Sequence, residues 1–589
     1  MPKIPRYLII SADEQTWKFD RPVIFLSDWC RLYERRHIWK NMDAIIAAPY
    51  GLELANKDTD NAQARILEDE LFLLLCNVLN RYHGVDHGAR FWKIIFGHWL
   101  KRYVDAMLNR VKTLEQCLAN YIISGVSLYA NNHYILAVQD SFSFILASND
   151  KHWNNALNAR ILSFLQHNIP LELISDCEPP NFCFNSFETP KKFFLKWIYK
   201  HLGKITSCMS RDSDAFIISS YLPRIKQIQL QLALGQFPQF WLSSRLEILI
   251  APDHQLRKKL ANQVIKKTSN NLEYILITML FELLPVCFLE GFSNLNNIAR
   301  QERWPKNPKF IFTSNNFDTD EVFKLWVATK VESGSKYFIG QHGNHYGTHR
   351  YFNPTIEEVI ADKFLTWGWT DGLPQHTPAF VFKIAGNKVV NFNLNGGLLL
   401  LEDMSCQHQI NTWDNSSQHL RYISDQIAFI EKLSAEPLKN LTIRLHSSYI
   451  YTNPLEESFW NELKPGIKID TSRRKLAHLI SESRLIIYSY DSSGILENLA
   501  KNIPTLAFWQ NDFDHLRDNA KPYYQLLINA GILHLTPESI AKKVNEIWSN
   551  VDAWWMQNKV QKARKEFCDR YARVSNKPIH DLKKILLSN

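Results

Sequence analysis

The sequence predicts an α/β protein in which parallel sheets are covered by helices. Short apolar runs alternate with helical patterns in the first fifty residues, again from residue 309, and most regularly after residue 397. Alternation of strands and helices at this spacing is typical of parallel sheets. Apolar residues make up 46% of the 589 residues and charged residues 22%, which supplies enough apolar material for large cores.

The N-terminal half, residues 1–390, is expected to be one Rossmann-like domain enlarged by helical insertions. Its short apolar runs predict strands at 7–10, 23–26, 44–48, 309–314 and 337–340. Between them, the stretch 62–120 has apolar residues at positions i, i+3 and i+4 and therefore predicts helix.

The next segment, residues 391–560, is expected to be a second Rossmann-like domain, followed by a helical tail at 561–589. Strands are predicted at 398–401, 441–445, 485–488 and 505–508, with helices at 418–434, 475–482 and 494–501. Two such domains leave a cleft between them, and ligands of parallel sheets bind at the carboxyl ends of the strands. Functional residues are therefore expected in the loops that follow strands.

The charge balance and the apolar segments restrict the class of partner. The net charge of 68 − 59 = +9 favours acidic partners such as nucleotides or anionic sugars. It is also compatible with peripheral contact with the inner membrane face. Lysine and arginine are dispersed, so no nucleic-acid partner is predicted. The most apolar window, 273–292, contains three glutamates and predicts a buried or amphipathic helix rather than a membrane span. We expect a cytoplasmic location.

The sharpest motif is the turn after the predicted strand 485–488. Ser492, Ser493 and Gly494 are expected at the start of a helix, where free amides and the helix dipole suit a phosphate or a carboxylate. Glu497 lies one turn further and is positioned to reach a ribose hydroxyl. The alternative is structural, because Ser492 is also a good helix cap.

A second motif is Arg444-Leu-His446, at the end of the predicted strand 441–445. A histidine at this position can donate a hydrogen bond to a nucleotide phosphate, and Arg444 can pair with negative charge. The alternative is a surface histidine that follows an edge strand.

The third motif is Gly340-Gln-His-Gly-Asn-His-Tyr-Gly347. Its glycines predict a tight turn that presents the imidazoles of His342 and His345, together with Gln341, to the cleft. Acid/base chemistry or acceptor binding is one interpretation, because histidine titrates near neutral pH. A metal site and a purely structural loop are the alternatives.

Two further carboxylate positions follow predicted strands. Asp28 and Arg31 come after 23–26, and Glu402 with Asp403 comes after 398–401. Either Asp28 or Glu402 is a candidate general base. For Asp28 the alternative is a cap of the helical segment that follows it.

Several of these segments resemble known families. The segment Glu497-Asn-Leu-Ala-Lys-Asn-Ile-Pro504 resembles the donor-domain element of GT-B glycosyltransferases. His446 resembles the His-Pro motif that holds the CMP-sugar phosphate in sialyltransferases and capsule Kdo transferases, with Ser447 in place of proline. Nearly the whole chain resembles a family of transferases from bacterial surface-polysaccharide gene clusters, through Trp17, 25–33, 80–83, 90–99, 340–347 and 491–504.

The resemblance implies a GT-B-like, metal-independent glycosyltransferase without a resident cofactor. The donor would be a CMP-activated ulosonic acid such as Kdo or a nonulosonate, and the acceptor a glycan or a lipid-linked glycan. In this interpretation the donor is bound by Arg444, His446, Ser492, Ser493, Gly494 and Glu497. The acceptor is bound by Gln341, His345 and Arg31, and its proton goes to His342, Asp28 or Glu402. An NDP-sugar transferase of the same fold and a non-catalytic glycan-binding assembly protein are the alternatives.

Overall fold

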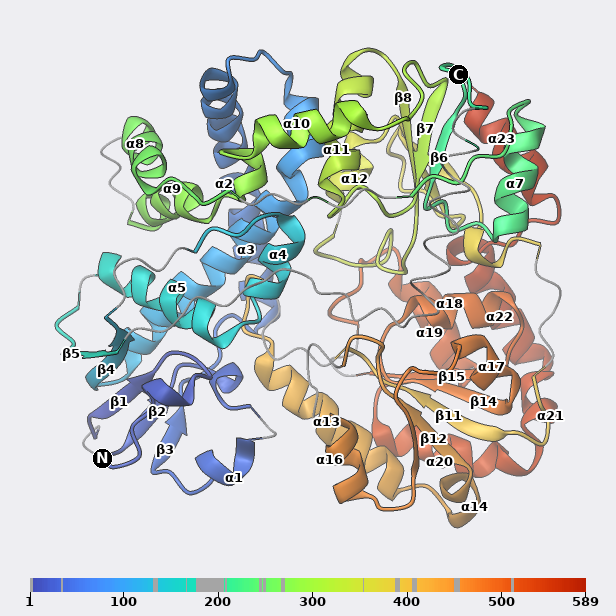
Figure 1. Ribbon diagram of the computed structural model, residues 1–589. Coiled ribbons are helices and arrows are strands. Elements are labelled where there is room, and N and C mark those ends of the chain that lie inside the picture. The colour runs from blue at the N-terminus through green and yellow to red at the C-terminus, as the bar shows by residue number, and fades with distance from the viewer. Residues whose placement is uncertain are drawn as a thin grey trace.

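The computed structural model confirms the predicted α/β class (Figure 1). Within the described residues, the strands form three sheets, and the strand pairings in all three are parallel. The structure describes residues 4–32, 35–130, 136–165, 167–175, 206, 209–242, 246, 250–265, 271–352, 354–386, 392–404, 410–449, 456–509 and 513–588.

The first sheet has the order β3-β2-β1-β4-β5 and lies at the lower left of Figure 1. Its strands are β1 (Arg6–Ile9), β2 (Val23–Phe25), β3 (Ala44–Ile46), β4 (Ile123–Tyr129) and β5 (Leu171–Ile174). The helices of this lobe are α1 (Arg36–Trp39), α4 (Ser141–Ala147) and α5 (Lys151–Phe164). Burial of β2 on both faces explains why its sequence is apolar throughout.

The second sheet, which we call the middle sheet, has the order β10-β9-β8-β7-β6. Its strands are β6 (Phe216–Ile218), β7 (Phe310–Thr313), β8 (Lys336–Gly340), β9 (Lys363–Thr366) and β10 (His376–Pro378). The helices around it are α7 (Arg224–Ala233), α10 (Phe292–Gln301), α11 (Glu321–Glu332) and α12 (Ile356–Ile360). The strands of the N-terminal half, which we expected in one domain, thus belong to two separate sheets.

The third sheet, which we call the C-terminal sheet, has the order β13-β12-β11-β14-β15-β16. Its strands are β11 (Gly397–Leu401), β12 (Leu441–Arg444), β13 (Lys468–Asp470), β14 (Ser483–Tyr488), β15 (Thr505–Phe508) and β16 (Leu533–His534). Its helices are α13 (Ser416–Glu431), α14 (Ala435–Lys439), α16 (Glu456–Leu463), α17 (Leu476–Ser481), α18 (Ser493–Ala500), α19 (Lys521–Asn529), α20 (Pro537–Ile547) and α21 (Val551–Trp555). The strands that we predicted in this segment are all present. The boundary predicted at 390/391 lies outside the described residues.

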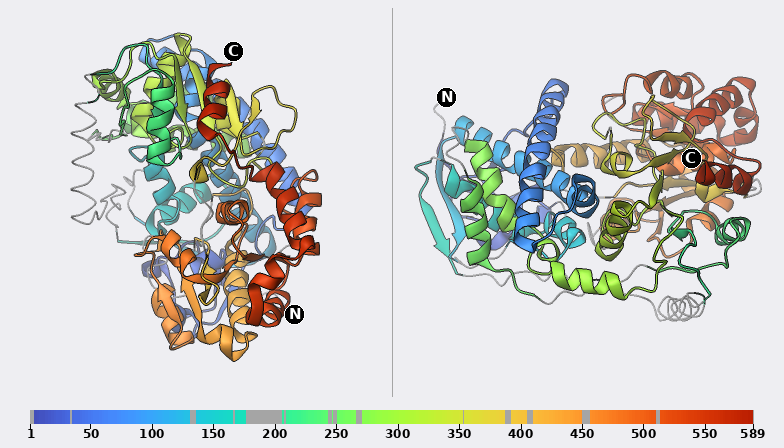
Figure 2. Two further views of the ribbon diagram at one scale, coloured as in Figure 1. Left: turned by 90° about the vertical axis from the view of Figure 1, so that its right-hand side faces the viewer. Right: turned by 90° about the horizontal axis from the view of Figure 1, so that it is seen from above.

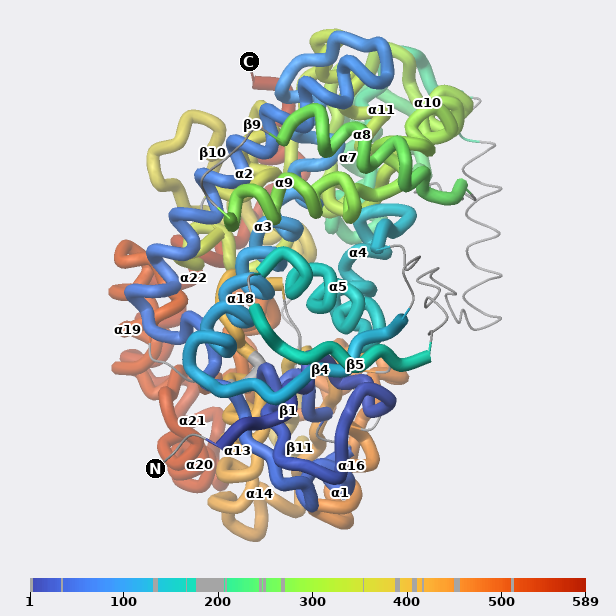
Figure 3. The backbone as a smooth tube through the Cα atoms, turned by 90° about the vertical axis from the view of Figure 1, so that its left-hand side faces the viewer, coloured from blue at the N-terminus to red at the C-terminus, as the bar shows by residue number. Residues whose placement is uncertain are grey.

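Two long helices connect the first lobe with the middle lobe (Figure 3). They are α2 (Leu54–His83) and α3 (Ala89–Asn120), and they divide the helical stretch predicted at 62–120. The division falls after Gly84, whose φ of 65° ends α2 in the left-handed conformation that glycine adopts easily. Helix α3 packs against α5 of the first lobe and against α11 and α12 of the middle lobe.

The apolar window at 273–292 is mostly buried, with Tyr274 exposed. It covers α9 (Asn271–Leu283), which packs against α8 (His254–Val264), and it ends where α10 begins. Among the helices in the described ranges, none combines the length and the apolar character needed to cross a membrane.

The predicted tail crosses from the C-terminal lobe back to the middle lobe (Figure 2). Helix α22 (Asn558–Tyr571) packs on α18 and α19, whereas α23 (Pro578–Leu587) packs on α7. Between the two helices, the Arg573 backbone exchanges hydrogen bonds of 2.9 Å with Val381 and Trp367 of the middle lobe. The tail therefore ties the two lobes together.

Candidate functional site

The C-terminal sheet contains a topological switch point between β11 and β14. From β11 the chain runs to β12 and β13 on one side, and from β14 it runs to β15 and β16 on the other side. The loops after β11 and β14 consequently diverge and leave a crevice at the carboxyl ends of these strands, where ligands of open α/β sheets bind.

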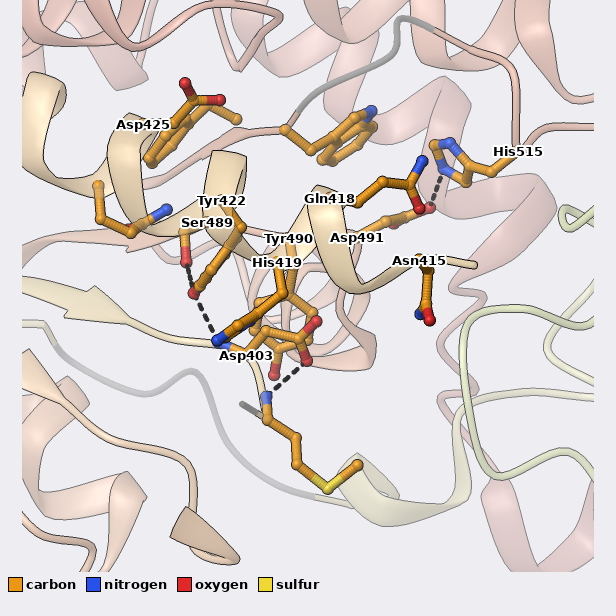
Figure 4. Close-up of a pocket in the computed structure, with 14 residues that line it drawn as sticks. Asp403, Asn415, Gln418, His419, Tyr422, Asp425, Ser489, Tyr490, Asp491 and His515 are labelled. Carbon is orange, nitrogen blue, oxygen red and sulfur yellow. Dashed lines mark hydrogen bonds and ion pairs between the residues drawn. The ribbon is translucent and has the colours of Figure 1, made fainter. Parts of the chain in front are cut away.

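A pocket of about 270 Å³ occupies this crevice (Figure 4). It lies between the N-terminal half of α13 and the loops after β11, β14 and β15. It is lined by Asp403, Met404, Asn415, Gln418, His419, Tyr422, Asp425, Gln426, Ser489, Tyr490, Asp491, Phe508, Trp509 and His515. None of these lining residues is a lysine or an arginine, so the pocket offers hydrogen-bonding groups, carboxylates and aromatic rings.

Hydrogen bonds organise the inner wall of the pocket. The Tyr422 hydroxyl accepts from the Asp403 amide at 2.8 Å and lies 2.7 Å from the Ser489 hydroxyl (Figure 4). Burial raises the pKa of Asp403 to about 6 and lowers that of His419 to about 4. Gln426 is 1% exposed, and its Oε1 has no hydrogen-bond partner among the described residues. A buried acceptor in the lining of a pocket is a candidate hydrogen-bond partner for a ligand.

The loop after β8 of the middle sheet reaches across to this pocket. Asn344 donates its side-chain amide to the carbonyl oxygen of Asp491 at 2.7 Å and to the Asp491 carboxylate at 2.9 Å. The Asn344 backbone amide donates to the Ser493 hydroxyl at 3.1 Å. On its other side, the Asp491 carboxylate pairs with His515 at 3.1 Å. The carboxyl edges of the middle and C-terminal sheets thus face each other and touch here.

His342 lies in this loop and is half-buried. Its Nδ1 is 3.0 Å from the Tyr346 hydroxyl, and its ring lies beside those of Tyr221 and Phe317, with centroids 6.0 Å and 5.6 Å away. Burial lowers the pKa of His342, against the attraction of Glu357. At neutral pH the imidazole is therefore uncharged and can accept a proton.

The two residues of this loop that we predicted to bind the acceptor, His345 and Gln341, pack against neighbouring side chains. His345 packs on Tyr346 with ring centroids 4.2 Å apart, and burial lowers the pKa of His345 to about 4. Gln341 is 1% exposed, and its amide bonds Gly343, Trp367 and Trp369 within the middle lobe. Both ends of the Gln341 amide are used inside the protein, so its position does not support contact with an acceptor.

The start of α18 has the structural features of a helix cap. The Ser492 hydroxyl accepts from the Gly494 amide at 3.2 Å. A Cβ on Gly494 would lie 2.3 Å from the Tyr488 hydroxyl, so this glycine allows the tyrosine to pack against the helix. Glu497 forms an ion pair with Lys383 of the middle lobe at 2.8 Å. Ser493 and Glu497 therefore take part in contacts between the two lobes.

Arg444 is the last residue of β12 and His446 follows the strand, on the far side of β11 from β14. Two strand spacings separate β12 and β14, which is about 10 Å. The Arg444 guanidinium is held by Asp470 at 2.7 Å and by the carbonyl of Arg474 at 3.0 Å. Burial and the charge of Arg444 lower the pKa of His446. Neither side chain lines the pocket described above.

Two of the predicted bases lie away from the loop of His342. Glu402 is 2% exposed, accepts from the Trp460 indole at 3.1 Å and lies against Glu456, so it does not face the crevice as we expected. Asp28 belongs to the first lobe and pairs closely with Arg31, whose guanidinium lies 4.7 Å from the Trp39 ring centroid. This edge of the first sheet does approach α13, because Ser27 donates a hydrogen bond to Asp414.

Sequence reasoning missed the face of α13 that lines the pocket. His419, Tyr422 and Gln426 are spaced i, i+3 and i+7, which places them on one side of a helix. This polar stripe, on the helix that follows a strand, is the sequence feature that could have indicated a binding surface. It gives no information about which loops the stripe faces. Within the described residues, no three His, Cys, Asp or Glu side chains are arranged to hold a metal ion.

The fold and the site define an α/β enzyme with a ligand pocket at a sheet switch point. The chain belongs to the LIC12162 family of transferases, whose family pattern matches residues 6–586. No curated protein matches the chain.

Solved structures share only a distant likeness with the chain. The spinosyn rhamnosyltransferase SpnG bound to spinosyn aglycone is 11% identical, with 50% of this chain and 77% of that chain covered and a TM-score of 0.28. MurG of Acinetobacter baumannii is 11% identical, with 50% and 76% covered and a TM-score of 0.29. The wall teichoic acid polymerase TagF is 13% identical, with 50% and 84% covered and a TM-score of 0.30.

Proposed function

We propose that this transferase moves a sugar from a nucleotide-activated donor to a glycan acceptor of a bacterial surface polysaccharide. The observation that carries the proposal is the pocket at the β11/β14 switch point, which the His342 loop of the opposite lobe adjoins. This arrangement supports a donor nucleotide held in the C-terminal lobe while the histidine approaches the reacting sugar from the middle lobe.

The chemistry of the pocket supports a nucleoside rather than a phosphate as its occupant. Its three carboxylates, Asp403, Asp425 and Asp491, are hydrogen-bond acceptors, and so is the unpartnered Oε1 of Gln426. A lining rich in acceptors favours a base with an exocyclic amine, and carboxylates accept from the N4 amine of cytosine. A CMP-sugar meets this requirement, and a CMP-activated ulosonic acid is our specific proposal.

In the proposed reaction, His342 takes the proton of the acceptor hydroxyl while that oxygen attacks the anomeric carbon. The bond from the anomeric carbon to the phosphate oxygen breaks, and the nucleotide leaves with the electron pair. In this scheme the positive end of α18 and the Ser493 hydroxyl stabilise this negative charge. Loss of one such donor typically costs about 3–4 kcal/mol of barrier. No resident cofactor takes part in this scheme.

Isothermal titration of the full chain with CMP, UDP and GDP tests the proposal. We expect CMP to bind most tightly, and Gln426→Met to weaken CMP binding at least tenfold. The matched control is Gln525→Met on the exposed side of α19, which should leave binding unchanged. Preferential binding of UDP or GDP would replace the CMP donor with an NDP-sugar. If no nucleotide bound, the glycosyltransferase proposal would fail and a glycan-binding role would gain support.

A further inference from the structure

A continuous chain of buried side chains runs from His342 back to helix α3. The Tyr346 hydroxyl lies 3.0 Å from Nδ1 of His342 and donates a close hydrogen bond to Oε1 of Glu357. Oε2 of the same carboxylate is 3.0 Å from Nε2 of His98. Tyr346 is 0% exposed, Glu357 6% and His98 9%. This row of hydrogen-bonded side chains therefore joins the β8 loop, α12 and α3. Its two ends, His98 and His342, are 244 residues apart in the sequence (342 − 98).

The direction of these hydrogen bonds fixes the tautomer of His342. An ionised carboxylate can only accept, so the single hydroxyl hydrogen of Tyr346 points to Glu357. The Tyr346 oxygen then accepts, and the partner that donates to it is Nδ1–H of His342. Neutral His342 consequently carries its proton on Nδ1 and a lone pair on Nε2. Among the described residues, no group hydrogen-bonds to this Nε2.

Glu357 is ionised in the folded protein. Burial by itself would raise the pKa of Glu357, but the hydrogen bond and the charge of His98, with the Tyr346 hydroxyl, outweigh burial and lower it to about 2. A negative charge two hydrogen bonds behind His342 stabilises the imidazolium that forms when Nε2 takes a proton. In a catalytic triad, a buried carboxylate holds the histidine in one tautomer and stabilises its imidazolium form. Glu357 is arranged to do the same here, with a tyrosine hydroxyl between the carboxylate and the histidine.

Of the titratable groups around His342, Glu357 is the anion that we expect to raise the pKa of the imidazole. Asp318 also attracts a proton on His342, but it is bound by Arg102 through two hydrogen bonds of 2.6 and 2.7 Å. His345 and Tyr221 flank the ring and are neutral at neutral pH, because burial lowers the pKa of His345 and raises that of Tyr221. His98 lies behind Glu357.

We propose that Glu357, acting through Tyr346 and anchored by His98, is the positioning residue that presents Nε2 of His342 to the acceptor hydroxyl. The inference rests on the proposed role of His342 as the base. Tyr346, Glu357 and His98 do not touch substrate in this proposal. Their effect is to select the tautomer of His342 and to stabilise its protonated form.

Nuclear magnetic resonance of the full chain with isotopically labelled histidine tests the tautomer without any substrate. The His342 signal is assigned by its loss in His342→Gln. We expect the nitrogen shifts to show a proton on Nδ1 and none on Nε2. Tyr346→Phe should convert this signal to a mixture of tautomers, and Glu357→Gln should lower the pKa at which it titrates. Tyr337→Phe is the matched control, because its buried hydroxyl has no partner among the described residues.

A pH profile of transfer separates the failure of this inference from the failure of the proposed function. We expect kcat to fall about 10²-fold in Glu357→Gln, with the acid limb moved to lower pH and CMP affinity unchanged. A purely structural role would not move the acid limb. Full activity of His342→Ala would refute the proposed base itself. Loss of activity in His342→Ala, with an unchanged acid limb in Glu357→Gln or a proton found on Nε2, would overturn the relay alone.

Discussion

Asn344 of the middle lobe holds Asp491 of the C-terminal lobe through both hydrogens of its side-chain amide, at 2.7 Å and 2.9 Å. Asp491 lines the pocket at the switch point, and Asn344 lies two residues after His342. The contact therefore fixes the distance between the proposed base and the proposed nucleotide pocket. Because a misplacement of about 1 Å between reacting groups can cost about 10²-fold in rate, this amide is placed to control both binding and chemistry.

Asn344→Ala should lower the thermal midpoint and weaken CMP binding together. The substitution removes one hydrogen bond to the Asp491 carbonyl and one to its partly buried carboxylate, a loss of about 1–3 kcal/mol. Differential scanning calorimetry and isothermal titration measure the two effects. Asn529→Ala, on the exposed end of α19, is the control and should change neither quantity. A lowered midpoint with unchanged CMP affinity would show that the contact is only structural.

The pocket carboxylate Asp403 gives CMP binding a defined pH dependence. Burial raises the pKa of Asp403 to about 6, so the group is ionised at neutral pH and protonated at pH 5. If the carboxylate accepts from the cytosine amine, CMP affinity falls as the pH drops through 6. Titrations at a series of pH values should show a steeper fall in the wild-type protein than in Asp403→Asn, in which only the CMP phosphate still titrates at about pH 6. A wild-type affinity that is constant from pH 5 to pH 8 would contradict the assignment.

The strands around the site were predictable because each is buried on both faces and therefore apolar along its length. Leu398–Leu401 and Leu485–Tyr488 are examples that the sequence alone identifies as strands. The directions of side chains after a strand were not predictable in the same way. Glu402 and Asp403 are neighbours that point to opposite sides, so one enters the core and the other the pocket.

Contacts between distant segments were the second limit. His342 stands out in the sequence because it lies in a glycine-rich turn. Nothing in the spacing of Glu357 or His98 indicates that these residues lie behind it, because their proximity depends on how α3 and α12 pack. In the same way, Ser492 had two interpretations, and only the geometry shows that its hydroxyl caps α18. Its predicted role in binding the donor remains a prediction.

Gly494→Ala should destabilise the C-terminal lobe although alanine favours helices. The new Cβ would lie 2.3 Å from the Tyr488 hydroxyl, so strand β14 or helix α18 must shift. Overpacking of this kind costs about 1–3 kcal/mol, which urea denaturation can measure. Gly88→Ala, at the start of α3, is the control because its Cβ would approach no heavy atom more closely than 3.8 Å. Equal midpoints for both variants would show that the Tyr488 contact is easily relieved.

The buried carboxyl Glu402 should make stability depend on pH. Burial and the nearby Glu456 raise the pKa of Glu402 well above its ordinary value of 4.5. The folded protein thus holds a proton that the unfolded chain releases once the pH exceeds about 4.5. The stability that this proton provides is complete below that pH and is lost progressively as the pH rises towards the folded pKa. Glu402→Gln removes this loss, since the amide cannot ionise. We therefore expect the variant to gain stability relative to the wild type as the pH rises from 4 to 8, as followed by thermal denaturation.

Glu436→Gln, on the exposed surface of α14, should give a difference from the wild type that is constant with pH. The same constant difference in Glu402→Gln would show that the Glu402 carboxyl is ionised in the folded protein.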